Sequence, residues 1–167
     1  ICVMDSFEMN KPDIFFCDKN FYKKIIFINR EKNKLFKDSL NINHYINFKI
    51  YFYLLFLFFK NNIFFRSYKI INFLFVDYNF EKKIYLNFFE KNNIKILLTS
   101  QINQTYISSA VSAINDLGGE IIGYTMSFQE KYSSMHHIDS INYFLSFNNS
   151  KYFKFKYSKL KKIISLG

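Results

Sequence analysis

The middle of the chain carries the clearest pattern of apolar and polar positions. The aliphatic run from Ile94 to Ser100 predicts a buried strand, and the polar residues 101–104 predict a connection. Thr105 stands where an N-cap hydroxyl would receive backbone N–H groups, and Gly118 stands where a left-handed residue would close a helix. Between them, apolar residues recur at the spacing of one helix face, at Ile107, Ala110, Val111, Ile114 and Leu117. Residues 120–128 then predict a second strand, and if the two strands are parallel neighbours the crossover is right-handed.

This strand, helix, strand unit holds most of the glycines and all of the alanines of the chain. Three of the four glycines lie in it, at Gly118, Gly119 and Gly123, together with the only alanines, Ala110 and Ala113. Alanines let a helix lie close to a sheet, and paired glycines let the chain reverse within two residues. The small residues therefore predict a tightly packed βαβ corner, and none of them requires catalysis.

Two apolar stretches precede this unit. Residues 50–59, bounded by Lys49 and Lys60, are too few to cross a bilayer as a helix, which takes about 20 residues. We expect them to form a core helix or a doubly buried strand, with an interfacial or truncated membrane segment as the alternative. Residues 61–80 predict buried strands or short helices separated by Asn-rich turns such as Asn61-Asn62.

Composition explains the many aromatic residues, and the net charge indicates the kind of partner. The chain has 23 Phe and 13 Tyr and lacks Trp. Because Phe, Tyr, Ile, Lys and Asn can be encoded by A and T alone, an AT-rich genome such as an organellar one explains this abundance without a functional aromatic array. The net charge of +10 favours nucleic acid or an anionic surface as a partner. A length of 167 residues suits one compact domain with a real core.

No pattern of catalytic or metal-ligating residues stands out. Cys2 and Cys17 lack the C-x-x-C spacing of a zinc or redox site and are interpreted as reduced thiols. His136 and His137 are adjacent, with Asp139 nearby, but neighbouring residues of a strand point to opposite sides. The chain also lacks the G-x-S-x-G, P-loop and dinucleotide-binding glycine motifs. We therefore expect no enzyme, no cofactor, no metal site and no small-molecule substrate.

Basic segments are the candidate RNA-binding elements. The C-terminal stretch has no acid after Asp139, and its aromatic and lysine residues alternate between positions 153 and 157. This period of two predicts a strand that packs its aromatic side and offers ammonium groups to phosphates. A second patch is interrupted by Glu31, and a solvated surface is the alternative for both. The predicted RNA-binding residues are Arg30, Lys32, Lys34, Lys37, Lys151, Lys154, Lys156, Lys159, Lys161 and Lys162.

The segment "IKILLTSQINQTYISSAVSAINDLGGEII", residues 94–122, resembles the C-terminal part of the ribosomal large-subunit protein fifteen family. There a strand leads through a polar connection into an A-x-x-A-I-x-x-x-G-G helix and a second strand. The resemblance covers residues 94–128, about a fifth of the chain. The matching residues are Ala110, Ala113, Ile114, Gly118 and Gly119, with Ser108 and Ser109 at the polar start.

The chain departs from this family in its first 90 residues. The family begins with a long extension rich in Gly, Lys and Arg, whereas residues 1–90 contain no Gly and only Arg30 and Arg66. A phosphoribosyltransferase, in which a helix also ends in Leu-Gly-Gly, would need acids and glycine in a loop at residues 99–102, and these are absent. The ribosomal resemblance is therefore preferred.

These patterns predict an α/β (α+β) protein with a small βαβ-containing domain. Residues 1–90 form an irregular, aromatic-rich N-terminal half, residues 91–130 the βαβ-like unit, and residues 131–167 a basic C-terminal strand or tail. The resemblance implies a structural constituent of the large ribosomal subunit that braces ribosomal RNA and neighbouring proteins. The AT-biased composition indicates that it is organelle-encoded and belongs to a mitochondrial ribosome in the matrix. The alternative is an organelle-encoded accessory subunit of an inner-membrane respiratory complex, so contact with a membrane stays open.

Overall fold

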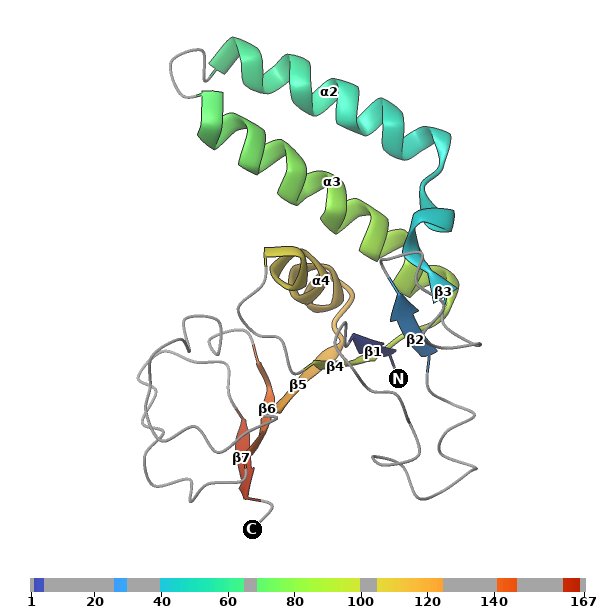
Figure 1. Ribbon diagram of the computed structural model, residues 1–167, viewed down its shortest axis with the longest axis vertical. Helices are drawn as coiled ribbons and strands as arrows, with labels where there is room; N and C mark the ends of the chain where they lie inside the picture. Colours follow the sequence, from blue (N-terminus) through green and yellow to red (C-terminus); the bar gives the residue numbers. More distant parts are fainter. Residues whose placement is uncertain are drawn as a thin grey trace.

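The computed structural model describes residues 2–4, 26–29, 40–64, 69–99, 105–124, 141–146 and 161–165. Within these ranges it confirms the predicted α/β class (Figure 1). The strands are β1 (Cys2–Met4), β2 (Ile26–Asn29), β3 (Leu40–Asn41), β4 (Ile96–Thr99), β5 (Glu120–Tyr124), β6 (Tyr143–Ser146) and β7 (Lys162–Ser165). The helices are the 3-10 helix η2 (Ile42–Tyr45) and the α-helices α2 (Phe48–Phe64), α3 (Lys69–Lys91) and α4 (Thr105–Asp116).

The strands pair in parallel throughout, in the order β3-β2-β1-β4-β5-β6-β7. The sheet therefore grows outward in both directions from the pair β1 and β4, whose register sets Met4 opposite Thr99. Each parallel connection has to carry the chain back across the sheet. Between β3 and β4 that connection consists of η2, α2 and α3, and between β4 and β5 it contains α4.

The strand, helix, strand unit forms as the sequence predicts. Strands β4 and β5 are parallel neighbours, with Ile96 opposite Glu120. On α4, the predicted apolar stripe faces inward, because Ile107, Ala110 and Ile114 are fully or almost fully buried. Two partly buried residues of the stripe, Val111 and Leu117, pack against the same core.

Gly118 ends α4 in the way that its position predicts. Its φ is +67°, in the left-handed region that glycine adopts at little cost. The Gly118 N–H donates to the Asn115 carbonyl at 3.0 Å, and the Gly119 N–H donates to the Ile114 carbonyl at 2.9 Å. These two bonds form a Schellman motif, which satisfies the last carbonyls of the helix and turns the chain into β5. Helix α3 ends in the same geometry, with Asn93 at φ +50°.

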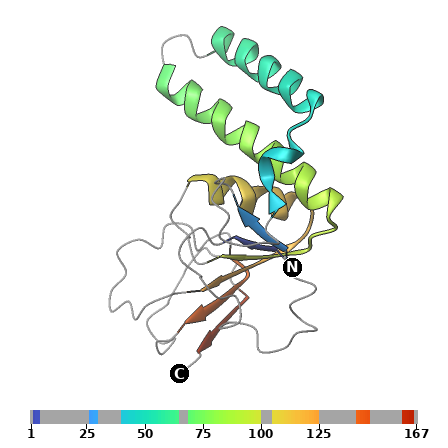
Figure 2. The same cartoon turned by 45° about the vertical axis from the view of Figure 1, so that its right-hand side comes forward.

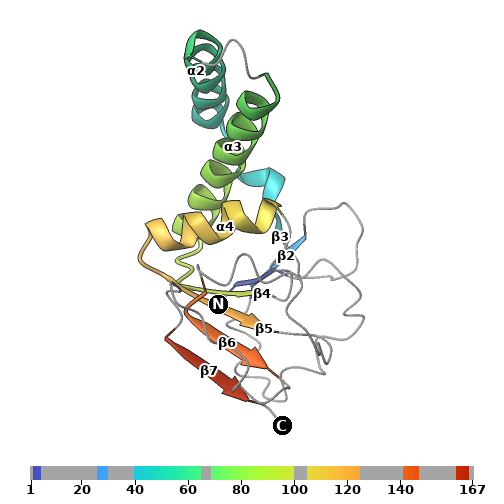
Figure 3. The same cartoon turned by 90° about the vertical axis from the view of Figure 1, so that its left-hand side faces the viewer.

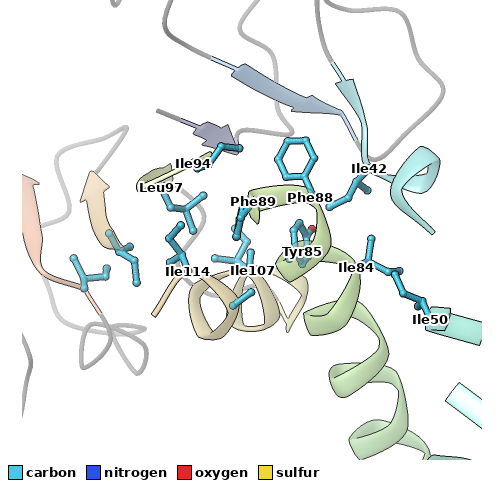
Figure 4. Packing of buried hydrophobic residues seen from close by; sticks show 14 of the residues in the cluster. Ile42, Ile50, Ile84, Tyr85, Phe88, Phe89, Ile94, Leu97, Ile107 and Ile114 are labelled. Atoms are coloured by element: carbon cyan, nitrogen blue, oxygen red, sulfur yellow. The ribbon is translucent and has the colours of Figure 1, made fainter. Parts of the chain in front are cut away.

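The core lies where the second half of α3, η2 and α4 meet the sheet (Figure 3). Figure 4 shows two adjacent aromatic residues of α3 in this core, Phe88 beside Ile42 of η2 and Phe89 on the side of Leu97. Both phenylalanines are completely buried. Small residues let α4 approach α3, since Ala110 and Ser109 are also completely buried and Ser109 Oγ donates to the Tyr78 carbonyl at 3.3 Å.

Helices α2 and α3 form a hairpin whose far half projects away from the sheet (Figures 1 and 2). This corrects the prediction for residues 50–59, which are helical but are not a core helix. Only Ile50 and Leu57 are buried among these ten residues. Residues 70–75 were also expected to be buried, yet five of the six are exposed.

Asn61-Asn62 is a second correction, because both residues lie within α2 and form no turn. The reason is that the apolar run before them already forms a helix, which continues through residue 64 before the chain reverses. Two long helices therefore occupy much of the N-terminal half, for which an irregular fold was expected. None of the helices in the described ranges combines the length and the apolarity needed to cross a membrane.

Candidate nucleic-acid interface

The basic C-terminal stretch reaches the described part of the structure at the edge strand β7. Lys162, the last of its six lysines, begins this strand, Lys161 directly precedes it, and both are exposed. The strand predicted from the alternation at positions 153–157 lies outside the described residues, and so do the other predicted RNA-binding residues: Arg30, Lys32, Lys34, Lys37, Lys151, Lys154, Lys156 and Lys159. The structure therefore shows where the basic C-terminal stretch joins the sheet, which is at the edge strand β7.

Lys161 is held across the neighbouring strand. Its Nζ lies 2.6 Å from Oε1 of Glu120 at the start of β5 and 5.7 Å from the ring centre of Tyr143 on β6. The hydrogen bond that Lys161 donates to Glu120, followed by the negative charge of that carboxylate, raises the pKa of Lys161. Because its charge is already paired with a carboxylate, Lys161 is better placed to hold the sheet edge together than to bind phosphate. Lys162 follows it on the exposed start of β7.

Asn142 organises this edge, although the sequence pattern did not single it out. Its backbone N–H donates to the Ile121 carbonyl at 3.0 Å, and its Oδ1 accepts from the Ile121 N–H at 2.8 Å. Its carbonyl accepts from the Lys161 N–H at 2.7 Å. One side chain and its backbone therefore tie the beginning of β6 to β5 and to β7. No simple signal could have found this residue, because Asn is abundant throughout the chain.

The carboxyl ends of β1 and β4 are the second place where function could reside. In open parallel sheets, ligands bind beyond the carboxyl ends of the strands where the strand order reverses. Here Met4 and Thr99 end those two strands, and Thr99 is 1% exposed. The segments that follow them, residues 5–25 and 100–104, lie outside the described residues, as do His136, His137 and Asp139. In the part that is described, no group of three His, Cys, Asp or Glu gathers to hold a metal ion.

The projecting hairpin is the third feature that an interface could use, and we call most of α2 together with the first part of α3 the apolar arm (residues 48–60 and 70–76). All large apolar side chains that are exposed among the described residues lie on this arm. On α2 they are Phe48, Tyr51, Phe52, Leu55, Phe56, Phe58 and Phe59, and on α3 they are Ile70, Ile71, Phe73, Leu74 and Phe75. Monomeric proteins expose contiguous apolar patches of at most a few hundred Å². The arm therefore exposes more apolar surface than a monomeric protein usually does.

Comparison of the chain with protein-family models, with curated proteins and with solved structures gave no match. The features of the chain that bear on its function are the basic edge, the apolar arm and the resemblance of residues 94–128.

Proposed function

We propose that this protein is a structural constituent of the large subunit of a mitochondrial ribosome, where it braces ribosomal RNA and neighbouring proteins and catalyses no reaction. The observation that carries this proposal is the separation of two kinds of surface. The basic C-terminal stretch joins the sheet at β7, whereas the apolar arm projects from the opposite end of the molecule (Figures 1 and 2). Such a molecule can contact RNA at one end and protein at the other.

The basic end has the character of a contact that positions RNA without reading its sequence. Six lysines occur between positions 151 and 162 without an acid among them. Lysine side chains bind phosphates as point charges, and this binding weakens steeply with salt because counterions are released. The last two residues of this stretch, Lys161 and Lys162, are tied to the sheet by hydrogen bonds from their N–H groups to the Asn142 carbonyl.

The β4–α4–β5 unit supports the family part of the proposal. Its strands pair in parallel, its helix buries Ala110, Ala113 and Ile114, and its Gly118-Gly119 pair ends the helix. These are the residues on which the resemblance to the large-subunit protein fifteen family rests. Their packing explains why the motif needs small residues at these positions, because larger side chains would hold α4 away from α3 and the sheet.

Sedimentation tests the proposal in the organelle itself. A detergent-solubilised organelle lysate is fractionated on a sucrose gradient, with and without ribonuclease, and the chain is followed by mass spectrometry. We expect it to migrate with large ribosomal subunits and to leave those fractions after ribonuclease treatment. Migration with a membrane complex that resists ribonuclease would refute the ribosomal role and favour the respiratory-complex alternative.

A matched pair of variants tests the basic end separately. Lys154→Gln combined with Lys156→Gln removes two charges from the C-terminal stretch, and Lys83→Gln combined with Lys95→Gln removes two exposed charges from elsewhere. Affinity for large-subunit ribosomal RNA is measured as salt is raised. The first variant is expected to reduce the slope of log K against log salt by roughly 1.4–1.8, because two phosphate contacts are lost, and the second is expected to leave it unchanged. Equal slopes for both variants would place the RNA contact elsewhere.

A further inference from the structure

The outer side of α2 is one continuous apolar face. Seven of its large apolar side chains are between 52% and 75% exposed. At 3.6 residues per turn, these seven positions span an arc of about 160°. Ile50 and Leu57, which are buried, lie on the opposite side of the helix, the side that packs against α3. We call the seven residues the α2 face: Phe48, Tyr51, Phe52, Leu55, Phe56, Phe58 and Phe59.

A helix that is apolar on both sides belongs in the interior of a protein or in a membrane. Helix α2 is not long and apolar enough to cross a membrane. It also differs from helices that lie on a membrane surface, which combine a strongly polar face with low overall hydrophobicity. Between Lys49 and Lys60, α2 has no charged residue on any side. The remaining environment for such a helix is the core of a helical bundle.

The size of the α2 face matches what a stable protein interface requires. With about 200 Å² for each fully exposed large side chain, the seven residues expose on the order of 800 Å². A standard interface buries about 800 Å² on each partner. By the same reckoning the five exposed residues of α3 would leave roughly 600 Å², which is at the upper end of the largest apolar patch on a typical monomer. A partner that covers the α2 face alone is therefore enough to bring the exposed apolar area of the chain down to that of a typical monomer.

We infer that the free chain forms a dimer in which the α2 faces of two copies pack together, so that the two hairpins build a four-helix assembly with both α2 helices in the middle and α3 on the outside. Phe48, Phe52, Leu55 and Phe59 follow the spacing i, i+4, i+7, i+11, which is the seam spacing of packed helices. In a two-fold dimer the same face serves both partners, so no second complementary surface is required. This inference goes beyond the proposed ribosomal role, and neither depends on the other.

The base of the hairpin is fixed to the body, which holds the α2 face ready for a partner. Asn87 Nδ2 on α3 donates to the Tyr45 carbonyl at 2.6 Å, just before α2 begins. The Tyr45 ring meets Phe88 edge-on, with ring centres 4.8 Å apart, and Lys91 Nζ lies 5.7 Å from the centre of the same ring. Because these contacts join the start of the hairpin to its buried end, little conformational freedom is lost at the base when a partner binds.

Charge fixes the direction of packing. Each chain carries a net charge of +10, so two bodies placed side by side would repel each other. An antiparallel arrangement of the hairpins sets the two bodies at opposite ends of the bundle. Salt screens the remaining repulsion and leaves the apolar contact intact, so the dimer is expected to tighten as salt rises. This is the reverse of the salt dependence expected for RNA binding.

Sedimentation velocity of the full purified chain over a range of protein concentrations tests the inference. We expect a dimer whose dissociation constant falls between 0.1 and 0.5 M salt. Leu55→Lys places a charge at the centre of the α2 face and is expected to raise the dissociation constant on the order of 100-fold or more. Ile71→Lys makes the same kind of change on the exposed side of α3 and is expected to leave dimerisation unchanged. Both positions are more than half exposed, and far-UV circular dichroism checks that the helices are retained.

Three results would overturn the inference. The wild-type chain could sediment as a monomer, it could form larger particles that Leu55→Lys does not disperse, or Ile71→Lys could dissociate the dimer as strongly as Leu55→Lys. Flotation of a monomeric chain with phosphatidylcholine vesicles, abolished by Leu55→Lys, would assign the α2 face to a lipid surface instead. Each of these results leaves the gradient test of the ribosomal role unaffected, so the two proposals can fail separately.

Discussion

Gly119 gives the sharpest test of how the βαβ corner is packed. A Cβ atom at this position would lie 2.7 Å from Cγ1 of Ile114 and 2.8 Å from the carbonyl oxygen of Lys95. The Ile114 side chain is completely buried, and the Lys95 carbonyl accepts the Glu120 N–H at 2.9 Å. Neither neighbour can retreat without disturbing the core or the backbone hydrogen bond that starts β5.

The expected cost of Gly119→Ala follows from these two contacts. Overpacking of a close-packed site costs about 1–3 kcal/mol, and weakening one backbone hydrogen bond adds about 1 kcal/mol. We therefore expect the free energy of unfolding to fall by about 2–4 kcal/mol. Gly118 is the matched control, because a Cβ there meets nothing within 4 Å and only the left-handed φ of +67° opposes it. Gly118→Ala is expected to cost about 1–2 kcal/mol.

Urea denaturation followed by far-UV circular dichroism measures both variants. All samples are compared at one protein concentration, because self-association makes apparent stability depend on it. If Gly119→Ala were within about 0.5 kcal/mol of the wild type, or less harmful than Gly118→Ala, the close approach of residue 119 to α4 would be refuted.

Three further predictions concern the core, the sheet edge and its ion pair. Phe88→Ala is expected to cost about 3–5 kcal/mol in urea denaturation, whereas Phe52→Ala, at a position 57% exposed, is expected to weaken association without destabilising the fold. Asn142→Ala leaves a buried N–H of β5 without its acceptor and is expected to cost about 1–3 kcal/mol by the same assay. Pairing with Glu120 raises the pKa of Lys161, so this ion pair stabilises the fold at neutral pH. Its contribution to stability is lost only as the pH rises through the raised pKa. NMR titration is expected to show a lower Lys161 pKa after Glu120→Gln.

The part of the fold that could be predicted from sequence is the part governed by local signals. The run that ends at Thr99 is short, aliphatic and followed by polar residues, and the stripe from Ile107 to Leu117 keeps helical spacing. Gly118 then marks the helix end because few other residues adopt a left-handed φ without strain. Each of these signals acts within one turn or one strand, so a single sequence contains all of it.

The sheet beyond this unit depends on pairings between distant segments. Strand β1 pairs with β4 across more than 90 residues, and Cys2 lies opposite Leu97. Parallel strands are not joined by a hairpin turn whose sequence would indicate their pairing. A strand of three residues, such as β1, is also too short to show an alternation of apolar and polar side chains. The role of Asn142 was hidden for the same reason, since its partners lie on β5 and β7. The RNA-binding assignments rest on charge alone, because eight of the ten residues lie outside the described ranges.

The residues of the apolar arm were predicted to be buried, but most of them are exposed. In residues 50–59 no polar side chain marks an outer face, so the pattern indicates that every side of the helix avoids water but not what covers it. The body of the molecule covers only the base of the hairpin, through the contacts of Tyr45 with Asn87 and Phe88. The sequence prediction of burial is therefore wrong for the single chain, and it would hold only in the dimer proposed above. If the α2 faces of two copies meet, Leu55 and Phe52 become core residues, as their neighbours in the sequence indicate.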